Sequence, residues 1–168
     1  MVAKRRYAAN TTVAVENSQV ELVRLLKRHG ATQHAFVNDS ASGRAAVIFA
    51  MGGRQMRLEL TVPGEDEFLT KEHPKPRGWY SFSQTRRQDW ARAQHQQAER
   101  QRWRALILVT KGKLELVAEG LSTIEREFLA DILLPDGRRV GDALAPGLAE
   151  AYETGNMPPL LPGIGGTG

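Results

Sequence analysis

One long segment, from Thr85 to Glu119, contains a single helix-disfavouring residue, Gly112. Projected at about 100° per residue, the second half of this segment places its apolar side chains within about a third of the helix circumference. These residues are Trp103, Leu106, Ile107, Thr110, Leu114 and Val117. The equivalent positions before Trp103 are polar or charged. The pattern therefore predicts one long helix whose second half is buried and whose first half projects from the body, frays or packs on a partner.

Charge is strongly segregated along the 168 residues, although the net charge is only +4. Residues 1–84 carry a net +4, residues 85–113 a net +6, and residues 114–168 a net −6. A basic block on a helix is typical of a polyanion-binding surface. The alternative is a solvated helix face whose charges meet the acidic C-terminal third, in the same molecule or in a neighbouring subunit.

The first third of the chain predicts a helix followed by a small sheet. Ser18 and Glu21 have the spacing of a capping box that would start a helix ending at Gly30. Three strands are expected after it, at 33–38, 44–51 and 54–62. Residues 54–62 alternate between apolar and polar side chains, and Gly52-Gly53 suits a two-residue hairpin turn. The predicted class is α+β, with a three-stranded antiparallel meander, a long basic helix and a small helical C-terminal part.

The other segments give weaker signals. Residues 1–16 are expected to be a basic segment with a short strand at Thr11–Val15, and 17–155 a single domain containing a mobile loop at 63–84. A second capping box, Ser122 with Glu125, predicts a short helix. Asp142 is expected to cap a last helix, with Pro146 near its first turn. The Pro- and Gly-rich residues 156–168 predict a flexible tail.

Several classes of chemistry are disfavoured. The chain has no cysteine, which excludes disulfides, thiolate metal sites and a cysteine nucleophile. Its four histidines lie on different segments without ligand spacing. Asp136, Asp142 and Glu125 suit a turn, a helix cap and a capping box, so no catalytic residue, metal ligand or cofactor is predicted. A magnesium-dependent nuclease stays open as an alternative.

The candidate binding residues are basic and aromatic. Arginine and lysine neutralise phosphates, and exposed aromatic rings stack on unpaired bases. The cations lie on one face of the predicted long helix and next to that face. The aromatic rings lie in the loop that precedes the helix. The predicted nucleic-acid-binding residues are Arg86, Arg87, Arg100, Arg104, Lys111, Trp79 and Tyr80.

Several stretches resemble a group of small phage- and prophage-encoded proteins. They include Arg102–Val117, Leu134-Pro-Asp-Gly137 and the run from Tyr152 to Pro162, which ends in Met-Pro-Pro-Leu-Leu-Pro. The resemblance implies a phage origin and a place in the bacterial cytoplasm, and it carries no catalytic residue across. The order of helix, meander and long helix also resembles the core of phage single-strand annealing proteins.

The sequence thus predicts a non-enzymatic phage protein that binds single-stranded or sequence-tolerant DNA or RNA during replication or recombination. The alternative is a phage factor that binds and inhibits a host or anti-phage defence protein. No apolar run approaches the length of a membrane span, and the N-terminus lacks the apolar core of a signal peptide. A homo-oligomer formed by the basic helix against the acidic tail fits either function.

Overall fold

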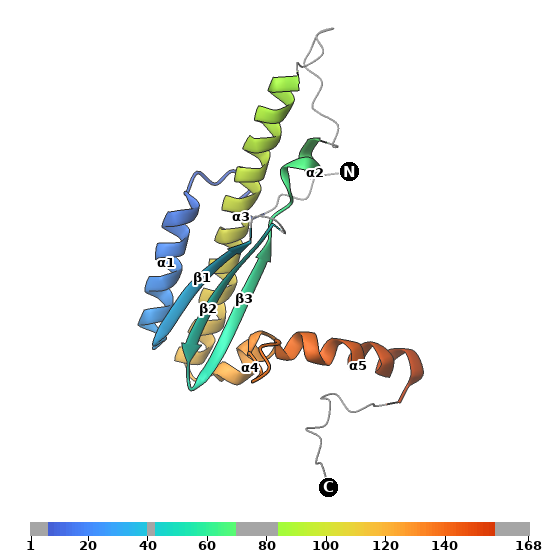
Figure 1. The fold of residues 1–168 in the computed structure, drawn as a ribbon. Helices are drawn as coiled ribbons and strands as arrows, with labels where there is room; N and C mark the ends of the chain where they lie inside the picture. The colour runs from blue at the N-terminus through green and yellow to red at the C-terminus, as the bar shows by residue number, and fades with distance from the viewer. Residues whose placement is uncertain (1–6, 40–42, 70–83, 157–168) are drawn as a thin grey trace.

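The computed structural model describes residues 7–39, 43–69 and 84–156 (Figure 1). The elements follow in the order α1 (Val15–Arg28), β1 (Gln33–Asp39), β2 (Arg44–Met51), β3 (Arg54–Thr61), α2 (Glu65–Leu69), α3 (Gln84–Ala118), α4 (Ile124–Phe128), the 3-10 helix η1 (Leu129–Asp131) and α5 (Val140–Thr154). The predicted α+β class, with a three-stranded meander, a long helix and small C-terminal helices, is confirmed.

The sheet has the order β1-β2-β3 with antiparallel pairing throughout. Gly52 and Gly53 join β2 to β3 with positive φ angles of 59° and 72°, which glycine adopts without strain. The predicted alternation holds on β3, where Met56, Leu58 and Leu60 are buried. One face of the sheet therefore belongs to the core.

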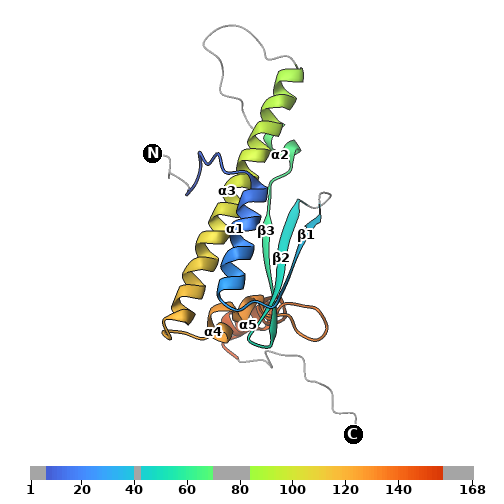
Figure 2. The same ribbon diagram turned by 90° about the vertical axis from the view of Figure 1, so that its left-hand side faces the viewer.

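Helices α1 and α3 lie side by side over that one face of the sheet, as the side view shows (Figure 2). Trp103 of α3 is completely buried, and its ring meets Phe36 of β1 edge-on, with the two ring centroids 5.7 Å apart. Leu22 and Leu26 of α1 are also buried in this cluster. The core is a single layer of side chains between two helices and one sheet face.

Helix α3 is continuous over 35 residues, and Gly112 does not interrupt it. The predicted stripe is buried at Trp103, Ile107, Thr110 and Leu114. The N-terminal end of α3 extends beyond the sheet (Figure 1), where its companion is the short helix α2. Of the predicted alternatives for the first half, projection is the one observed.

Two predictions at the N-terminus are wrong. No strand forms at Thr11–Val15, because α1 already begins at Val15. Ser18 is therefore inside the helix and does not cap it. Its hydroxyl, buried against the core, donates to the Ala14 carbonyl oxygen at 3.2 Å, four residues back. The start of α1 is set by burial of its apolar face, and the Ser18–Glu21 spacing is coincidental.

Three further predictions need correction. Within the expected loop 63–84, residues Glu65–Leu69 form α2, and residues 70–83 lie outside the described part, as does most of the expected tail. The N-cap of α4 is Thr123, whose hydroxyl accepts the Arg126 amide at 3.3 Å, and not Ser122. Helix α5 begins at Val140, so Asp142 is inside its first turn and Pro146 lies further into the helix than expected.

The C-terminal part is joined to the sheet through the chain around η1. Ile132 forms an isolated antiparallel bridge with Met56, and the Leu133 amide donates to the Gln55 carbonyl oxygen at 2.8 Å. Phe128 is completely buried, edge-on to Phe49 with ring centroids 5.9 Å apart. This hydrogen bonding and packing cover the free edge of β3 near its start.

Arg139 links the start of α5 to β3 through two carboxylates. Its guanidinium donates to both carboxylate oxygens of Asp142 at 2.9 Å and lies 3.3 Å from the carboxylate of Glu59 on β3. The hydrogen bonds from Arg139 lower the pKa of the Asp142 carboxyl below its ordinary value.

Phe128→Ala should lower the free energy of unfolding by about 3–5 kcal/mol, because it leaves a cavity between β2 and the C-terminal part. Urea denaturation followed by circular dichroism measures the change. Leu121→Ala is the control, since Leu121 is 72% exposed and its truncation should cost under about 0.5 kcal/mol. Equal losses in the two variants would contradict the packing described.

The Arg139–Asp142 pair has a predictable pH dependence. A lowered pKa in the folded state stabilises the fold above the ordinary carboxyl pKa, and this contribution is lost as the pH falls through the lowered value. In Arg139→Gln the pKa of Asp142 should rise toward that of an isolated aspartate. Carboxyl-carbon NMR titration of both proteins measures the pKa directly, and an unchanged value would show that Arg139 does not hold Asp142.

Candidate nucleic-acid interface

The basic residues predicted to bind phosphate are spread along the whole of α3. Arg86 and Arg87 are exposed in its first turn, and Lys111 is exposed near its other end. At 1.5 Å per residue, about 36 Å separates Arg87 from Lys111 along the helix axis. The predicted cations are thus on one element, but they do not form one cluster.

Two predicted phosphate ligands are already engaged within the protein. Arg104 forms an ion pair with Glu21 of α1. The Arg100 guanidinium donates to the side-chain oxygen of Gln97 at 2.6 Å and is half-buried. No local sequence pattern predicts the Glu21–Arg104 pair, because the two residues are 83 positions apart.

The glutamines beside these arginines also have intramolecular partners. The Gln97 side chain donates to the carbonyl oxygens of Ala9 and Thr11 at 2.9 and 3.1 Å. The Gln101 side chain donates to the carbonyl oxygen of Tyr7 at 2.7 Å. The middle of this α3 face therefore holds the N-terminal segment and α1, which leaves the projecting end as the more open cationic surface.

The projecting end carries a cation that the prediction omitted. Arg92 is exposed there, five and six positions after Arg87 and Arg86 on the same helix, and we call these three residues the projecting basic end. Neither Arg87 nor Arg92 forms an ion pair with any residue that the structure describes. The same holds for Lys111 within the described part of the chain. Arg92 was overlooked because its helical position continues the buried stripe.

Some of the aromatic residues lie among the residues that the structure describes, and others lie outside them. Trp79 and Tyr80 lie outside the described residues, so their stacking role stays a prediction. Trp103 is buried, as the sequence predicted. Any ring platform for bases must therefore come from residues other than Trp103.

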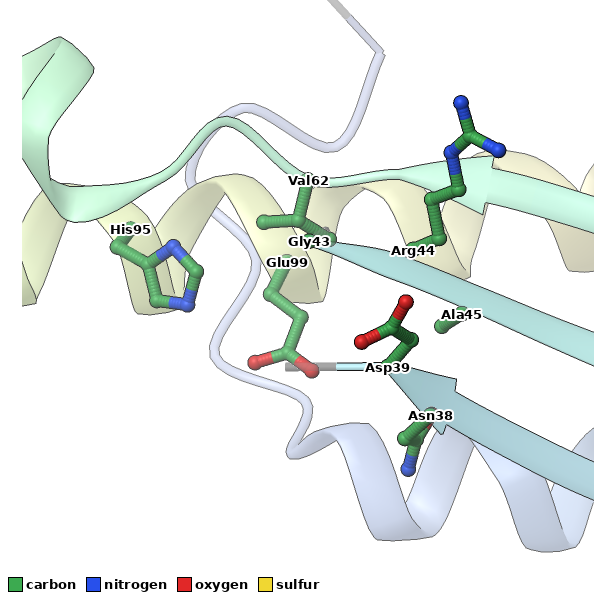
Figure 3. A pocket seen from close by; sticks show the side chains of 8 residues that line it. All are labelled: Asn38, Asp39, Gly43, Arg44, Ala45, Val62, His95 and Glu99. Atoms are coloured by element: carbon green, nitrogen blue, oxygen red, sulfur yellow. The ribbon is translucent and has the colours of Figure 1, made fainter. Parts of the chain in front are cut away.

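A small pocket opens beside α3, where β1 ends and β2 begins (Figure 3), with a volume of about 200 Å³. Asp39 and Glu99 both line it with carboxylates, and His95 lies at its far end. The His95 Nδ1 atom is 2.8 Å from the Pro63 carbonyl oxygen, which orients the ring. Arg44 also lines the pocket, but the two carboxylates outnumber this one cation, so the pocket is poorly suited to the phosphates of a nucleic acid.

Within residues 7–39, 43–69 and 84–156 no three histidines or carboxylates converge as a metal site would require. Three carboxylates of the C-terminal part are paired with basic side chains instead. Asp131 meets Lys113 at 3.2 Å, Asp136 meets Arg138 at 2.8 Å, and Asp142 meets Arg139. These groups are used to fold the C-terminal part.

Across the same described residues, no helix combines the length and the apolar character needed to cross a membrane. Comparison of the chain with protein families, with curated proteins and with solved structures finds no match. The residues of the chain itself therefore carry the functional argument.

The Glu21–Arg104 ion pair should be weak, because the two side chains are 50% and 22% exposed. A double-mutant cycle with Glu21→Gln and Arg104→Gln should give a coupling free energy of about 0.2–1 kcal/mol. Thermal or urea unfolding of the four proteins measures it. A coupling that survives undiminished in high salt would contradict this solvent-exposed character.

Proposed function

We propose that this protein binds nucleic acid through the projecting basic end of α3, as a non-enzymatic accessory factor. Its ligand is single-stranded or sequence-tolerant DNA or RNA. The proposed role is in phage replication or recombination, and the resemblance to small phage proteins supports the phage origin and the bacterial cytoplasm.

The observation that carries the proposal is the placement of Arg87 and Arg92. Both are exposed on a helix end that extends past the sheet, and neither is neutralised by a described carboxylate. Elsewhere in the second half of the chain, Arg104, Lys113, Arg138 and Arg139 each have an acidic partner. Phosphates supply the missing counter-charge, and their binding releases condensed counterions.

We expect binding that tolerates different nucleotide sequences, because the projecting basic end offers few groups that could contact base edges. Arginines on a straight helix contact phosphates readily, and phosphate contacts carry no direct sequence information. The described residues place no second helix across this end in the manner of a helix-turn-helix, since α2 has only five residues. The predicted stacking by Trp79 and Tyr80 would favour unpaired strands over duplex.

The test is binding of labelled oligothymidylate, measured by fluorescence anisotropy between about 50 and 200 mM salt. Arg87→Gln with Arg92→Gln should weaken binding and lower the slope of log K against log salt by about 1.4, for two lost phosphate contacts on a single strand. Arg104→Gln should change the slope less, because Arg104 is paired with Glu21.

The matched control is Arg54→Gln with Arg126→Gln, two exposed arginines outside α3 that give the same change in net charge. Its slope should stay close to that of the unchanged protein. Equal effects of the two double variants would contradict a localised site. Adding magnesium to the same assay tests the nuclease alternative, and the oligonucleotide should stay intact.

A second candidate, binding to a host or defence protein, has its own supporting observation. Leu108, Val109 and Leu116 are 49%, 56% and 41% exposed on the outer side of α3. Neighbouring exposed apolar side chains are typical of protein interfaces and are not needed for phosphate binding. Absence of oligonucleotide binding even at low salt would overturn the nucleic-acid proposal and favour this second one.

A further inference from the structure

Three exposed cations gather where the C-terminal end of α1 lies beside α3. Arg24 and Arg28 are on α1, and Lys111 is on α3. All three side chains are exposed, and none of them forms an ion pair with a residue that the structure describes. We call these three residues the α1–α3 basic seam.

The neighbouring positions of Arg28 and Lys111 follow from the contact between the two helices. The ion pair between Glu21 and Arg104 fixes the level at which α1 meets α3. Both helices run in the same direction, side by side (Figures 1 and 2). Arg28 comes seven positions after Glu21. Lys111 likewise comes seven positions after Arg104. Seven residues are almost two full turns, so Arg28 and Lys111 occupy matching positions on the same side of the contact, about 10 Å further along.

The acidic side chains around the seam do not cancel its charge. Glu21 is already neutralised by Arg104. Glu115 is exposed one turn beyond Lys111, and it is the one carboxylate of α3 near the seam that no described cation neutralises. Three cations therefore share one available carboxylate. Like charges held side by side repel each other, and an anion bound between them removes that repulsion.

The seam lies on the side of α3 that leads to the projecting basic end. Arg86 and Lys111 are 25 positions apart, which is close to seven full turns, so they share one side of the helix. Arg100 and Arg104 lie between them on that side. Residues 7–14, which two glutamine side chains hold beside it, contain no acidic residue. Basic residues therefore mark this side of α3 from the projecting basic end to the seam.

Few carboxylates interrupt this side. Asp89 and Glu99 are the acidic residues of α3 between Arg86 and Lys111. Glu99 lines the pocket beside β1 and β2 (Figure 3), about a third of a turn away from the side of Lys111. Asp89 lies near the three arginines of the projecting basic end, which outnumber it. The two basic clusters are thus not separated by an acidic barrier.

We propose that the α1–α3 basic seam is a second phosphate-binding site for the same strand that the projecting basic end binds. The inference rests on the proposed nucleic-acid binding and extends it to the length of the ligand. About 36 Å separates Arg87 from Lys111 along α3. Phosphates of a stacked strand follow one another at about 3.4 Å, so about eleven nucleotides span this distance and a more extended strand needs fewer. Contact at two points strengthens binding beyond either site alone, because the second contact is intramolecular.

Fluorescence anisotropy of the full chain with labelled oligothymidylate of about 20 nucleotides tests the proposal between about 50 and 200 mM salt. The seam variant, Arg28→Gln with Lys111→Gln, should weaken binding at least about tenfold at the lower salt concentration. It should also lower the slope of log K against log salt by about 1.4, as the end variant, Arg87→Gln with Arg92→Gln, should do.

Combining the two variants distinguishes one shared strand from two separate ones. A strand that contacts both sites at once loses both sets of contacts, so the fourfold variant should lower the slope by about 2.8. Strands that bind the two sites separately would leave the slope of the remaining site in each double variant. Slope reductions that do not add would therefore overturn the shared strand.

The control is Arg54→Gln with Arg126→Gln, which removes the same net charge outside both sites. If the seam variant matches this control while the end variant weakens binding, the second site is overturned and the proposed function stands. If no oligonucleotide binds, or if the end variant also matches the control, the proposed function itself is overturned, and the second site with it.

Cross-linking tests the contact at the seam directly, because the native chain has no cysteine to compete for the reagent. Arg24→Cys, labelled with a maleimide carrying benzophenone, should cross-link to the bound oligothymidylate on illumination. Arg126→Cys with the same label is the control, since Arg126 is exposed on α4, away from the seam. Equal yields from the two labelled proteins would overturn the second site.

Discussion

The Trp103 indole is enclosed where α3 crosses the sheet, with the Phe36 ring edge-on to it and no accessible surface left. This contact fixes where the buried half of α3 begins. Every buried residue of α3 that packs in the main core cluster, Trp103, Ile107 and Leu114, lies from this point onward. The half before Trp103 is longer than the sheet can cover, so the projecting end and its arginines follow from where this one contact sits.

The same single-sided packing explains the rest of the architecture. Two helices satisfy one face of a three-stranded sheet, and antiparallel sheets tolerate solvent on the other face. The C-terminal part is attached at the edge of β3 through Phe128 and Ile132, which leaves α5 beyond the body. The molecule thus consists of a compact centre with two extensions, a basic one at the start of α3 and an acidic one at α5.

The elements with strong periodicity were the predictable ones. Alternation over β3 and the apolar stripe of α3 gave both elements within a residue or two, because each pattern reflects burial of one face. The start of α1 was misplaced, because Ser18 looks like a cap but is held in the core with its hydroxyl on Ala14. Whether a short polar motif caps a helix depends on tertiary burial, and the local spacing of residues does not reveal that burial.

The site was less predictable than the fold for a related reason. Arg104 and Arg87 are both arginines of the basic block at residues 85–113. Arg104 is paired with Glu21, whereas Arg87 is exposed at the projecting basic end. Which cation is neutralised depends on contacts between distant segments, and a local charge pattern cannot reveal them. The charge blocks identify the basic helix, and only the fold separates its engaged arginines from its exposed, unpaired ones.

The continuity of α3 has a consequence for its motions. It is one unbroken α-helix of 35 residues, but only its second half packs in the main core cluster. Fraying from Gln84 separates α3 only from the short helix α2, whereas opening the helix near Trp103 requires the main core to separate. Amide hydrogen exchange should therefore slow by orders of magnitude along a single helix, from local unfolding at its basic end to global unfolding at its centre. A ligand bound at the basic end would be read out as slower exchange there, with the core amides unchanged.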